Sequence, residues 1–275
     1  MKQPAQALTI TIVQTDIYWE DKQANLDMLE KKIRLVKEKM EIVVLPEMFS
    51  TGFSMKPEQL AEKMEGPSVK WMKKLSASLN IILVGSLIIE EGGKYFNRLI
   101  WMLPNGEYGH YDKRHLFGHA MEDQHYTAGN KRLIASVKGW KLNLQVCYDL
   151  RFPVWARQAY SLKAPQETAV QEPEYDVLVY VANWPESRSN AWKTLLQARA
   201  IENQCYIVGV NRTGNDGNDV YYSGDSMIVD PMGAVIYSHG HKEIIFTCSL
   251  PLDKLTEVRS GLPFLKDADP FMIGN

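Results

Sequence analysis

The stretch LNLQVCYDLRFPVW, residues 142–155, places a cysteine between a strand-like run and a segment that Pro153 opens as a helix. A nucleophile at a strand-to-helix turn has an exposed side chain, and the field of the helix N-terminus favours its thiolate. The backbone N–H of Tyr148 would then face the same space and stabilise an oxyanion. Cysteine is also a common small core residue, and the position of Cys147 alone favours that packing role. Both interpretations stay open on this stretch.

A cysteine nucleophile also needs a base or a cation nearby, because a free thiol has a pKa of about 8.5. Four of the six histidines cluster in HYDKRHLFGHAMEDQH, residues 110–125, so a Cys–His dyad is one hypothesis. Glu47 is a second candidate, because apolar residues on both sides of it in EIVVLPEMF predict burial beside a partner. The alternative is a Glu47 that turns into solvent. Lys113, in YGHYDKRHLF, offers a fixed positive charge, although most lysines are solvated.

Alternating strand and helix patterns must position these residues. Strand-like runs recur at residues 8–14, 41–46, 81–89, 96–103, 142–147, 175–183, 205–212, 225–230 and 243–250. Apolar stripes at helical spacing, or a proline in the first turn, predict helices over residues 21–40, 67–80, 153–162 and 189–203. Ser or Asn is expected to cap the last of these helices. Hairpins are expected to turn at residues 92–93 and 230–233. The pattern predicts one α/β domain over residues 1–275, with a mixed sheet and outer helices.

Composition argues against several classes of protein. The formal net charge of −2 gives no strong attraction to nucleic acid or to an anionic membrane. No apolar run approaches the roughly 18 residues that span a bilayer, and no signal-peptide pattern opens the chain, so a cytoplasmic location is expected. Three widely spaced cysteines without a CxxC or HExxH motif predict neither a disulfide framework nor a zinc site, and Cys205 and Cys248 are expected in the core. The polar segment 162–175 is expected to be an exposed loop.

Three motifs occur in the order LPEMF, YDKRHLF and CYDLRFP, and together they resemble the carbon–nitrogen hydrolase (nitrilase) superfamily, whose members use a Glu–Lys–Cys triad. The resemblance continues through YFNRLIWMLPNGE, ANWPESR, QARAIENQCYIVGVNRTGNDG and YSGDSMIVDPMG, so it covers nearly the whole chain. It implies a four-layer αββα sandwich with mixed sheets, which dimerises to αββααββα or forms a higher homo-oligomer. It also implies that no metal and no organic cofactor is needed.

Transferred to this sequence, the resemblance implies that Glu47 is the general base, that Lys113 stabilises the oxyanion and that Cys147 is the nucleophile. Many members have a second glutamate shortly after the lysine motif. Glu122 is the match here, and its implied role is to support the lysine or to relay a proton. Tyr148 would donate its backbone N–H to the oxyanion, and the histidines become loop and supporting residues.

Within the superfamily, CYDLRFP, ANWP and ARAIENQ look most like the ω-amidase branch. That branch hydrolyses the distal amide of 2-oxoglutaramate or 2-oxosuccinamate to the 2-oxo acid and ammonia. Such a substrate carries a carboxylate, so Arg151 and Arg188 are candidates for its cationic partner, although Arg151 could equally form a structural ion pair with Asp149. Phe117, Trp184 and Tyr148 are expected either to shape the pocket or to pack in the core.

Relatives with the same triad act instead as nitrilases, as N-carbamoyl amino acid amidohydrolases or as deaminated glutathione amidases, and the triad does not choose among them. A catalytically silent scaffold is a further alternative, and an intact Glu, Lys and Cys in three motifs argues against it. The sequence therefore predicts a cytoplasmic hydrolase whose partners are a small amide and water, with no cofactor, nucleic acid or membrane.

Overall fold

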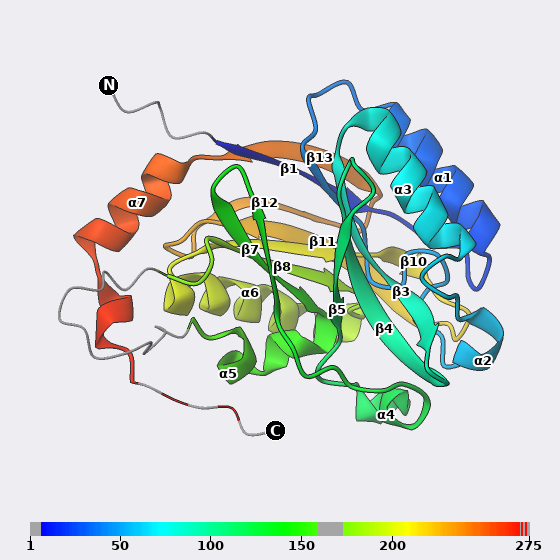
Figure 1. Ribbon diagram of the computed structural model, residues 1–275. Helices are drawn as coiled ribbons and strands as arrows, with labels where there is room; N and C mark the ends of the chain where they lie inside the picture. Colours follow the sequence, from blue (N-terminus) through cyan, green and yellow to red (C-terminus); the bar gives the residue numbers. More distant parts are fainter. Residues whose placement is uncertain (1–6, 159–172, 270, 272, 274–275) are drawn as a thin grey trace.

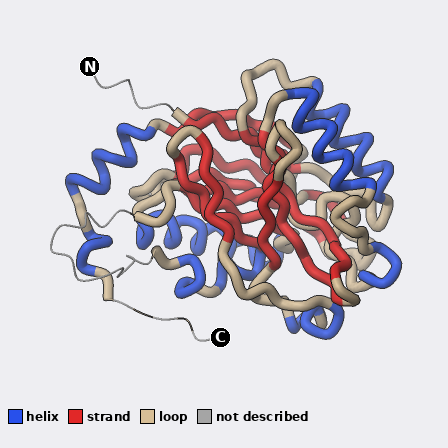
Figure 2. Tube along the Cα trace, viewed as in Figure 1, coloured by secondary structure: helices blue, strands red, loops and turns tan. Residues whose placement is uncertain are grey.

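The computed structural model describes residues 7–158, 173–269, 271 and 273, and it forms two mixed β-sheets with helices against them (Figures 1 and 2). Residues 159–172, and with them most of the segment 162–175 expected as a loop, lie outside the described residues. The α/β class expected from the sequence is confirmed. Two sheets take the place of the one mixed sheet that the strand pattern predicted.

The first sheet has the strand order β13–β1–β2–β3–β4–β5. Its strands are β1 (Leu8–Gln14), β2 (Ile42–Val44), β3 (Ile82–Glu91), β4 (Lys94–Met102), β5 (Tyr108–Asp112) and β13 (Ile244–Leu250). β1, β2 and β3 run parallel, whereas β4, β5 and β13 are antiparallel to their neighbours. α1 (Lys22–Arg34) and α3 (Pro67–Leu79) lie side by side against this sheet (Figure 1).

The second sheet has the order β10–β11–β9–β8–β7–β6, with β12 paired to β11. Its strands are β6 (Leu133–Val137), β7 (Trp140–Val146), β8 (Val177–Ala182), β9 (Tyr206–Asn211), β10 (Thr213–Asn215), β11 (Tyr221–Val229) and β12 (Val235–Gly240). β7, β8 and β9 are parallel. α6 (Ser189–Asn203) packs on β9 and β11. Gly209 allows this close approach, because a Cβ there would stand 2.6 Å from Leu196.

Apolar side chains of both sheets join in one large core. Val84 of the first sheet and Leu144 of the second belong to it, and both are fully buried. A second apolar cluster fills the space between the first sheet and the pair α1 and α3. Because the central strands are covered on both faces, they read in the sequence as continuous apolar runs.

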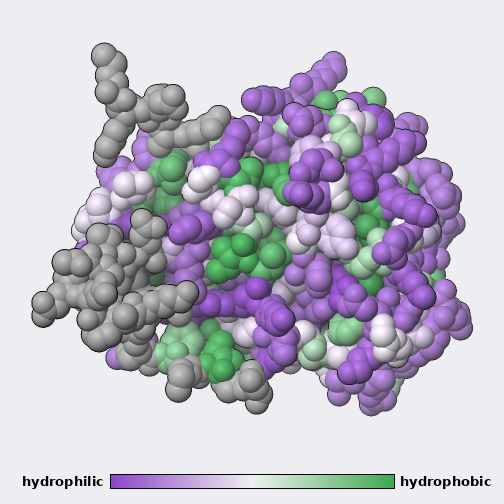
Figure 3. All heavy atoms as spheres, in the orientation of Figure 1, coloured by the Kyte–Doolittle hydropathy of each residue, from purple (hydrophilic) through white to green (hydrophobic). Residues whose placement is uncertain are grey.

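The remaining elements are short or lie near the end of the chain. They are α2 (Pro57–Leu60), η1 (Gly118–Ala120), α4 (Glu122–His125), η2 (Cys147–Arg151), α5 (Pro153–Ala156), η3 (Glu186–Arg188), α7 (Leu252–Gly261) and η4 (Phe264–Asp267). In the described part of the chain, no helix combines the length and the apolar character that crossing a membrane requires. The face drawn in Figure 3 is largely hydrophilic, with apolar side chains in smaller groups.

The helix predictions are correct in place but not in every boundary. α3 starts at Pro67 and ends before Asn80 as expected, whereas α1 ends at Arg34, six residues before the predicted end. The helix expected from Pro153 ends after one turn, at Ala156. The expected Ser or Asn cap on α6 is wrong, because Arg188 occupies the cap position and its side chain makes no capping hydrogen bond.

Gly129 fixes the path of the chain beside Lys113. Its N–H donates to the Lys113 carbonyl at 2.9 Å. A Cβ on Gly129 would stand only 2.1 Å from the backbone oxygen of Asp112, so no larger residue fits without moving this strand end. The close approach of two backbone segments therefore requires glycine here.

Gly129→Ala is expected to destabilise the protein by about 1–3 kcal/mol, because backbone rather than a flexible side chain must yield. Gly261→Ala is the matched control, since Gly261 is exposed and a Cβ there would meet no heavy atom within 4 Å. Urea unfolding measures both variants. Equal midpoints for Gly129→Ala and Gly261→Ala would contradict the role assigned to Gly129.

Candidate active site

Three strand ends bring the predicted site residues together. Glu47 lies three residues after β2, Lys113 directly follows β5, and Cys147 directly follows β7. β2 and β5 belong to the first sheet and β7 to the second, so the site lies where the two sheets meet. Glu47 and Lys113 are both close enough to Cys147 to act electrostatically on its thiol. The alternative in which Glu47 turns into solvent is wrong, because its side chain is fully buried.

The ammonium group of Lys113 is buried between two carboxylates. Its Nζ lies 2.9 Å from Glu47 Oε1 and 2.8 Å from Glu122 Oε2. Burial alone lowers the pKa of Lys113, but the charges of Glu122 and Glu47 outweigh that effect and hold the pKa above its ordinary value. Lys113 is therefore a fixed cation at neutral pH.

Glu122 completes this cluster at the start of the short helix α4. Its Oε2 accepts the backbone N–H of Phe117 at 2.6 Å as well as the lysine. Burial raises the pKa of Glu122; the charge of Lys113 opposes that shift, and the charge of Glu47 adds to it. The two carboxylates thus compete for one ammonium group.

Glu47 is held by the segment that follows β8. The Asn183 N–H donates to Glu47 Oε2 at 2.8 Å, and Asn183 Nδ2 donates to the Glu47 carbonyl at 2.6 Å. Asn97 Nδ2 donates to Glu47 Oε1 at 2.8 Å and to Glu122 Oε1 at 3.2 Å. Sequence reasoning missed both asparagines as site residues, and the only signal for Asn183 was its place in ANWP, directly after a strand.

Cys147 opens η2 in a left-handed backbone conformation, with φ of 44°. Its Sγ lies 3.8 Å from the carbonyl oxygen of Asn183. Burial, and then the negative charge of Glu47, raise the pKa of the Cys147 thiol well above its usual value, although Lys113 opposes the shift. This shift opposes formation of the thiolate. The helix field that was expected to favour the thiolate is weak, because only the 3₁₀ turn η2 and the single turn of α5 follow β7.

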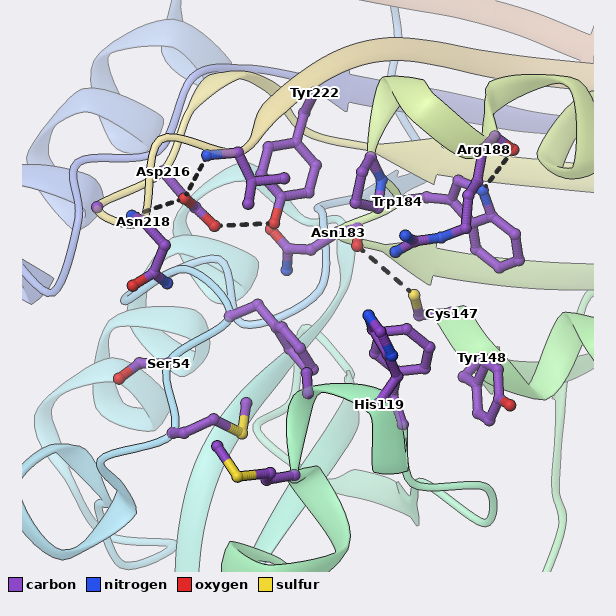
Figure 4. A pocket seen from close by; sticks show the side chains of 18 of the residues that line it. Ser54, His119, Cys147, Tyr148, Asn183, Trp184, Arg188, Asp216, Asn218 and Tyr222 are labelled. Atoms are coloured by element: carbon purple, nitrogen blue, oxygen red, sulfur yellow. Dashed lines mark hydrogen bonds between the residues drawn. The ribbon is translucent and has the colours of Figure 1, made fainter.

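A cavity of about 670 Å³ opens onto Cys147 and Lys113. Its wall includes all four of the predicted substrate-binding residues, Phe117, Arg151, Trp184 and Arg188, together with Tyr148. Figure 4 shows Cys147, Trp184 and Arg188 on one side of this cavity and Asp216 and Asn218 across from them. Sequence reasoning missed Asp216 as a residue of the cavity wall, because it lies in the turn GNDGN, which matches no catalytic motif.

The two candidate arginines both face aromatic rings. The Arg188 guanidinium lies 5.2 Å from the centre of the Phe117 ring, and that of Arg151 lies 5.0 Å from Trp184. Over the described residues, these ring contacts are the interactions of the two guanidinium groups, and neither pairs with a carboxylate of the protein. The structural ion pair between Arg151 and Asp149 is therefore wrong, since Asp149 accepts its hydrogen bonds from other groups.

The histidines take secondary positions. His119 lines the cavity, and His115 pairs with Asp149 behind it. In the part of the chain that the structure describes, no histidine nitrogen hydrogen-bonds to the Cys147 sulfur, so the Cys–His dyad has no support. Nor do the described residues hold a group of three or more His, Cys, Asp or Glu side chains that could bind a metal ion.

Comparison with known proteins agrees with this fold and shows the family to which the chain belongs. A family model described as carbon–nitrogen hydrolase matches residues 9–260. The chain is 39% identical to "Omega-amidase YafV" of Escherichia coli K12, over 97% of this chain and 98% of the relative. It is 31% identical to "2-oxoglutaramate amidase" of Bacillus subtilis, over 94% of this chain and 96% of the relative. It is also similar to the crystal structure of a CN-hydrolase superfamily protein from Xanthomonas campestris with an arsenic adduct in its active site, with a TM-score of 0.93 and 39% identity over 98% of this chain and all of that one.

The chain belongs to the carbon–nitrogen hydrolase family. The resemblance to this superfamily, and to its bacterial ω-amidases, is therefore confirmed, and so is the expectation of a hydrolase that acts on carbon–nitrogen bonds. The arrangement of the two sheets matches the structures of this superfamily.

The raised pKa of Cys147 predicts how its thiol reacts. The rate constant for alkylation by iodoacetamide should keep rising from about pH 8 to pH 10, whereas an exposed thiol with a pKa of about 8.5 levels off in that range. A short cysteine peptide with both ends blocked supplies that comparison. Cys147→Ala measures the contribution of Cys205 and Cys248, which is subtracted from the rate of the original protein. A rate that is already constant below pH 7 would mean that Cys147 is a thiolate and that Lys113 outweighs burial and Glu47.

Proposed function

We propose that this protein hydrolyses the terminal amide of a small 2-oxo acid amide, 2-oxoglutaramate or 2-oxosuccinamate, through a cysteine thioester. Cys147 is the nucleophile, Glu47 the general base and Lys113 the cation that stabilises the oxyanion. The observation that carries these roles is the buried cluster of Lys113, Glu47 and Glu122 beside the sulfur of Cys147. The names of the two similar amidases support the substrate class.

The protonation states dictate how the attack begins. Cys147 rests as a thiol, because burial and Glu47 raise its pKa. Glu47 therefore removes the proton as the sulfur attacks the amide carbon, so that no free thiolate accumulates. The developing oxyanion lies between Lys113 Nζ and the backbone N–H of Tyr148.

The same groups complete the reaction. Glu47 returns its proton to the nitrogen of the departing ammonia, and the acyl group stays on Cys147 as a thioester. Glu47 then takes a proton from a water molecule, which attacks the thioester carbon. The oxyanion forms again beside Lys113, and its collapse releases the 2-oxo acid and returns the proton to the sulfur.

Glu122 supports the lysine. Two hydrogen bonds from Lys113, at 2.8 and 3.0 Å, and one from the Phe117 N–H fix both the ammonium group and the start of the cavity wall. A second carboxylate also offsets the cost of burying the lysine. Glu47 is then free to exchange a proton during the reaction while Lys113 keeps a charged partner.

Arg188 is the proposed partner of the substrate carboxylate. Its guanidinium lines the cavity on the side of Cys147 and has no carboxylate partner among the described residues (Figure 4). Phe117 holds it from one face, and Trp184 donates its Nε1–H to the Arg188 carbonyl at 2.8 Å. Arg151 is more exposed, so it is expected to contribute less. The pairing of two such subunits into αββααββα, which the resemblance implies, stays a prediction.

Cys147→Ala is expected to fold normally and to lower turnover of 2-oxosuccinamate by at least about a thousandfold. Ammonia release measures this, with an N-carbamoyl amino acid and a simple nitrile as competing substrates. Preference for either competitor would contradict the substrate class, and normal turnover by Cys147→Ala would contradict the nucleophile. Lys113→Ala is a less clean test, because it leaves two buried carboxylates unpaired, a change that typically costs about 3–5 kcal/mol of stability.

Arg188→Ala is expected to raise KM for 2-oxosuccinamate about 10- to 100-fold, because a hydrogen bond to a charged group contributes about 1.5–3 kcal/mol. KM for butyramide, which has no carboxylate, should change little. Arg151→Ala is the matched comparison and should have the smaller effect on KM. An equal rise in KM for both amides would show that Arg188 shapes the cavity without binding the carboxylate.

A further inference from the structure

Asp149 is a fully buried carboxylate that the proposed mechanism does not use. It lies two residues after Cys147 in η2 and accepts four hydrogen bonds. Tyr111 Oη and the Val146 N–H donate to Oδ2 at 2.7 and 3.0 Å. The His115 N–H and His115 Nδ1 bond to Oδ1 at 3.0 and 2.8 Å. A carboxylate only accepts, so the His115 ring carries its hydrogen on Nδ1.

The positions of these donors along the chain are informative. Tyr111 and His115 stand two residues before and two residues after Lys113. Val146 directly precedes Cys147. One carboxylate therefore holds the lysine segment on both sides of Lys113 and also holds the turn that carries the sulfur, although these segments come from different sheets.

We propose that Asp149 is a positioning residue that sets the distance between the Lys113 ammonium and the Cys147 sulfur, through its hydrogen bonds to Tyr111, His115 and Val146. The proposal rests on the proposed roles of Lys113 and Cys147. Asp149 touches neither reacting group, and it acts through the backbone segments that carry them.

The backbone around Cys147 and Lys113 shows why a positioning residue is needed. Cys147 has φ of 44°, a conformation that costs a non-glycine residue about 1–3 kcal/mol unless its surroundings hold it. Lys113 directly follows β5, and its N–H still pairs with the Asn97 carbonyl of β4 at 3.0 Å, but the chain leaves the sheet beyond it. A displacement of about 1 Å between reacting groups can cost on the order of a hundredfold in rate. A strained turn after β7 and a segment that leaves the first sheet after Lys113 must therefore be held relative to each other, and Asp149 contacts both.

Further contacts fix the side chains of Tyr111 and His115, which donate to Asp149. Tyr111 Oη accepts hydrogen bonds from Trp155 Nε1 at 2.9 Å and from the Arg114 N–H at 3.1 Å while it donates to Asp149. The His115 ring stacks on Phe152, with ring centres 3.8 Å apart. The donors thus have fixed positions before substrate arrives.

Asp149→Asn tests the proposal. Asparagine offers one oxygen in place of two, and its amide group would face N–H or O–H donors. kcat for 2-oxosuccinamate should fall about a hundredfold, while KM changes by less than about threefold, because the cavity wall is untouched. Asp230→Asn is the control for loss of a buried carboxylate: Asp230 accepts the N–H groups of Met232 and Ala234 at 2.9 Å in a turn outside the cavity wall. It should lower the melting temperature and leave kcat unchanged.

A pair of His115 variants separates positioning from bulk stability. Asparagine places its Nδ2–H near the position of His115 Nδ1 and can still donate to Asp149, whereas glutamine places its amide near Nε2. His115→Asn should keep at least about ten times the kcat of His115→Gln. If Asp149→Asn does not fold, the comparison of His115→Asn with His115→Gln tests the positioning role of Asp149 by itself.

Two results would contradict the positioning role of Asp149. One is an Asp149→Asn protein that is folded and has kcat within about threefold of the original. The other is equal kcat for His115→Asn and His115→Gln. Cys147→Ala in the same series distinguishes the two proposals. If Cys147→Ala retains turnover, the proposed function fails. If Cys147→Ala is inactive and Asp149→Asn is fully active, only the positioning role of Asp149 fails.

Discussion

The site depends on one buried ammonium group held between two carboxylates. Removing three charges from water is costly, and only close pairing with additional hydrogen bonds makes it tolerable. Lys113 supplies the pairing, and Asn97 donates to both Glu47 and Glu122. Burial and the charge of Glu47 oppose ionisation of Cys147, although Lys113 favours it. The sulfur therefore needs a base to remove its proton, and Glu47 has that part in the proposed mechanism.

This electrostatic arrangement places a demand on the fold, because its members come from both sheets. A shift of either sheet would separate the lysine from the sulfur, so the contact between the sheets must be rigid. The apolar core supplies bulk rigidity, whereas the fine placement comes from buried polar bridges. Asn183 links the end of β8 to Glu47, and Asp149 links the end of β7 to the segment around Lys113. Buried hydrogen bonds of this kind act over short distances and therefore fix geometry more sharply than apolar contacts do.

The sequence predicted the parts of this structure that depend on local pattern. Central strands appear as apolar runs because they are covered on both faces, and the sequence placed Glu47 and Cys147 at the ends of such runs. β5, β6 and β10 were missed, since edge and near-edge strands carry mixed residues. The raised pKa of Cys147 had no signal in the sequence, because its ionisation depends on summed charge and burial, which no local pattern records. Asn97 was missed for a related reason: a single asparagine has no spacing that marks it.

Chemistry and selectivity occupy different segments of this molecule. The residues proposed to break the amide bond lie at the ends of β2, β5 and β7, inside the buried cluster, whereas Arg188 and Trp184 lie on η3 and the segment before it. On the proposed roles, a change in the η3 segment is expected to alter what the cavity accepts without disturbing the charges around the sulfur. The cavity wall rather than the triad then carries the assignment of substrate. In this chain the most informative part of that wall is the Arg188 guanidinium, which faces the cavity with an aromatic ring beside it and no carboxylate partner in the described structure.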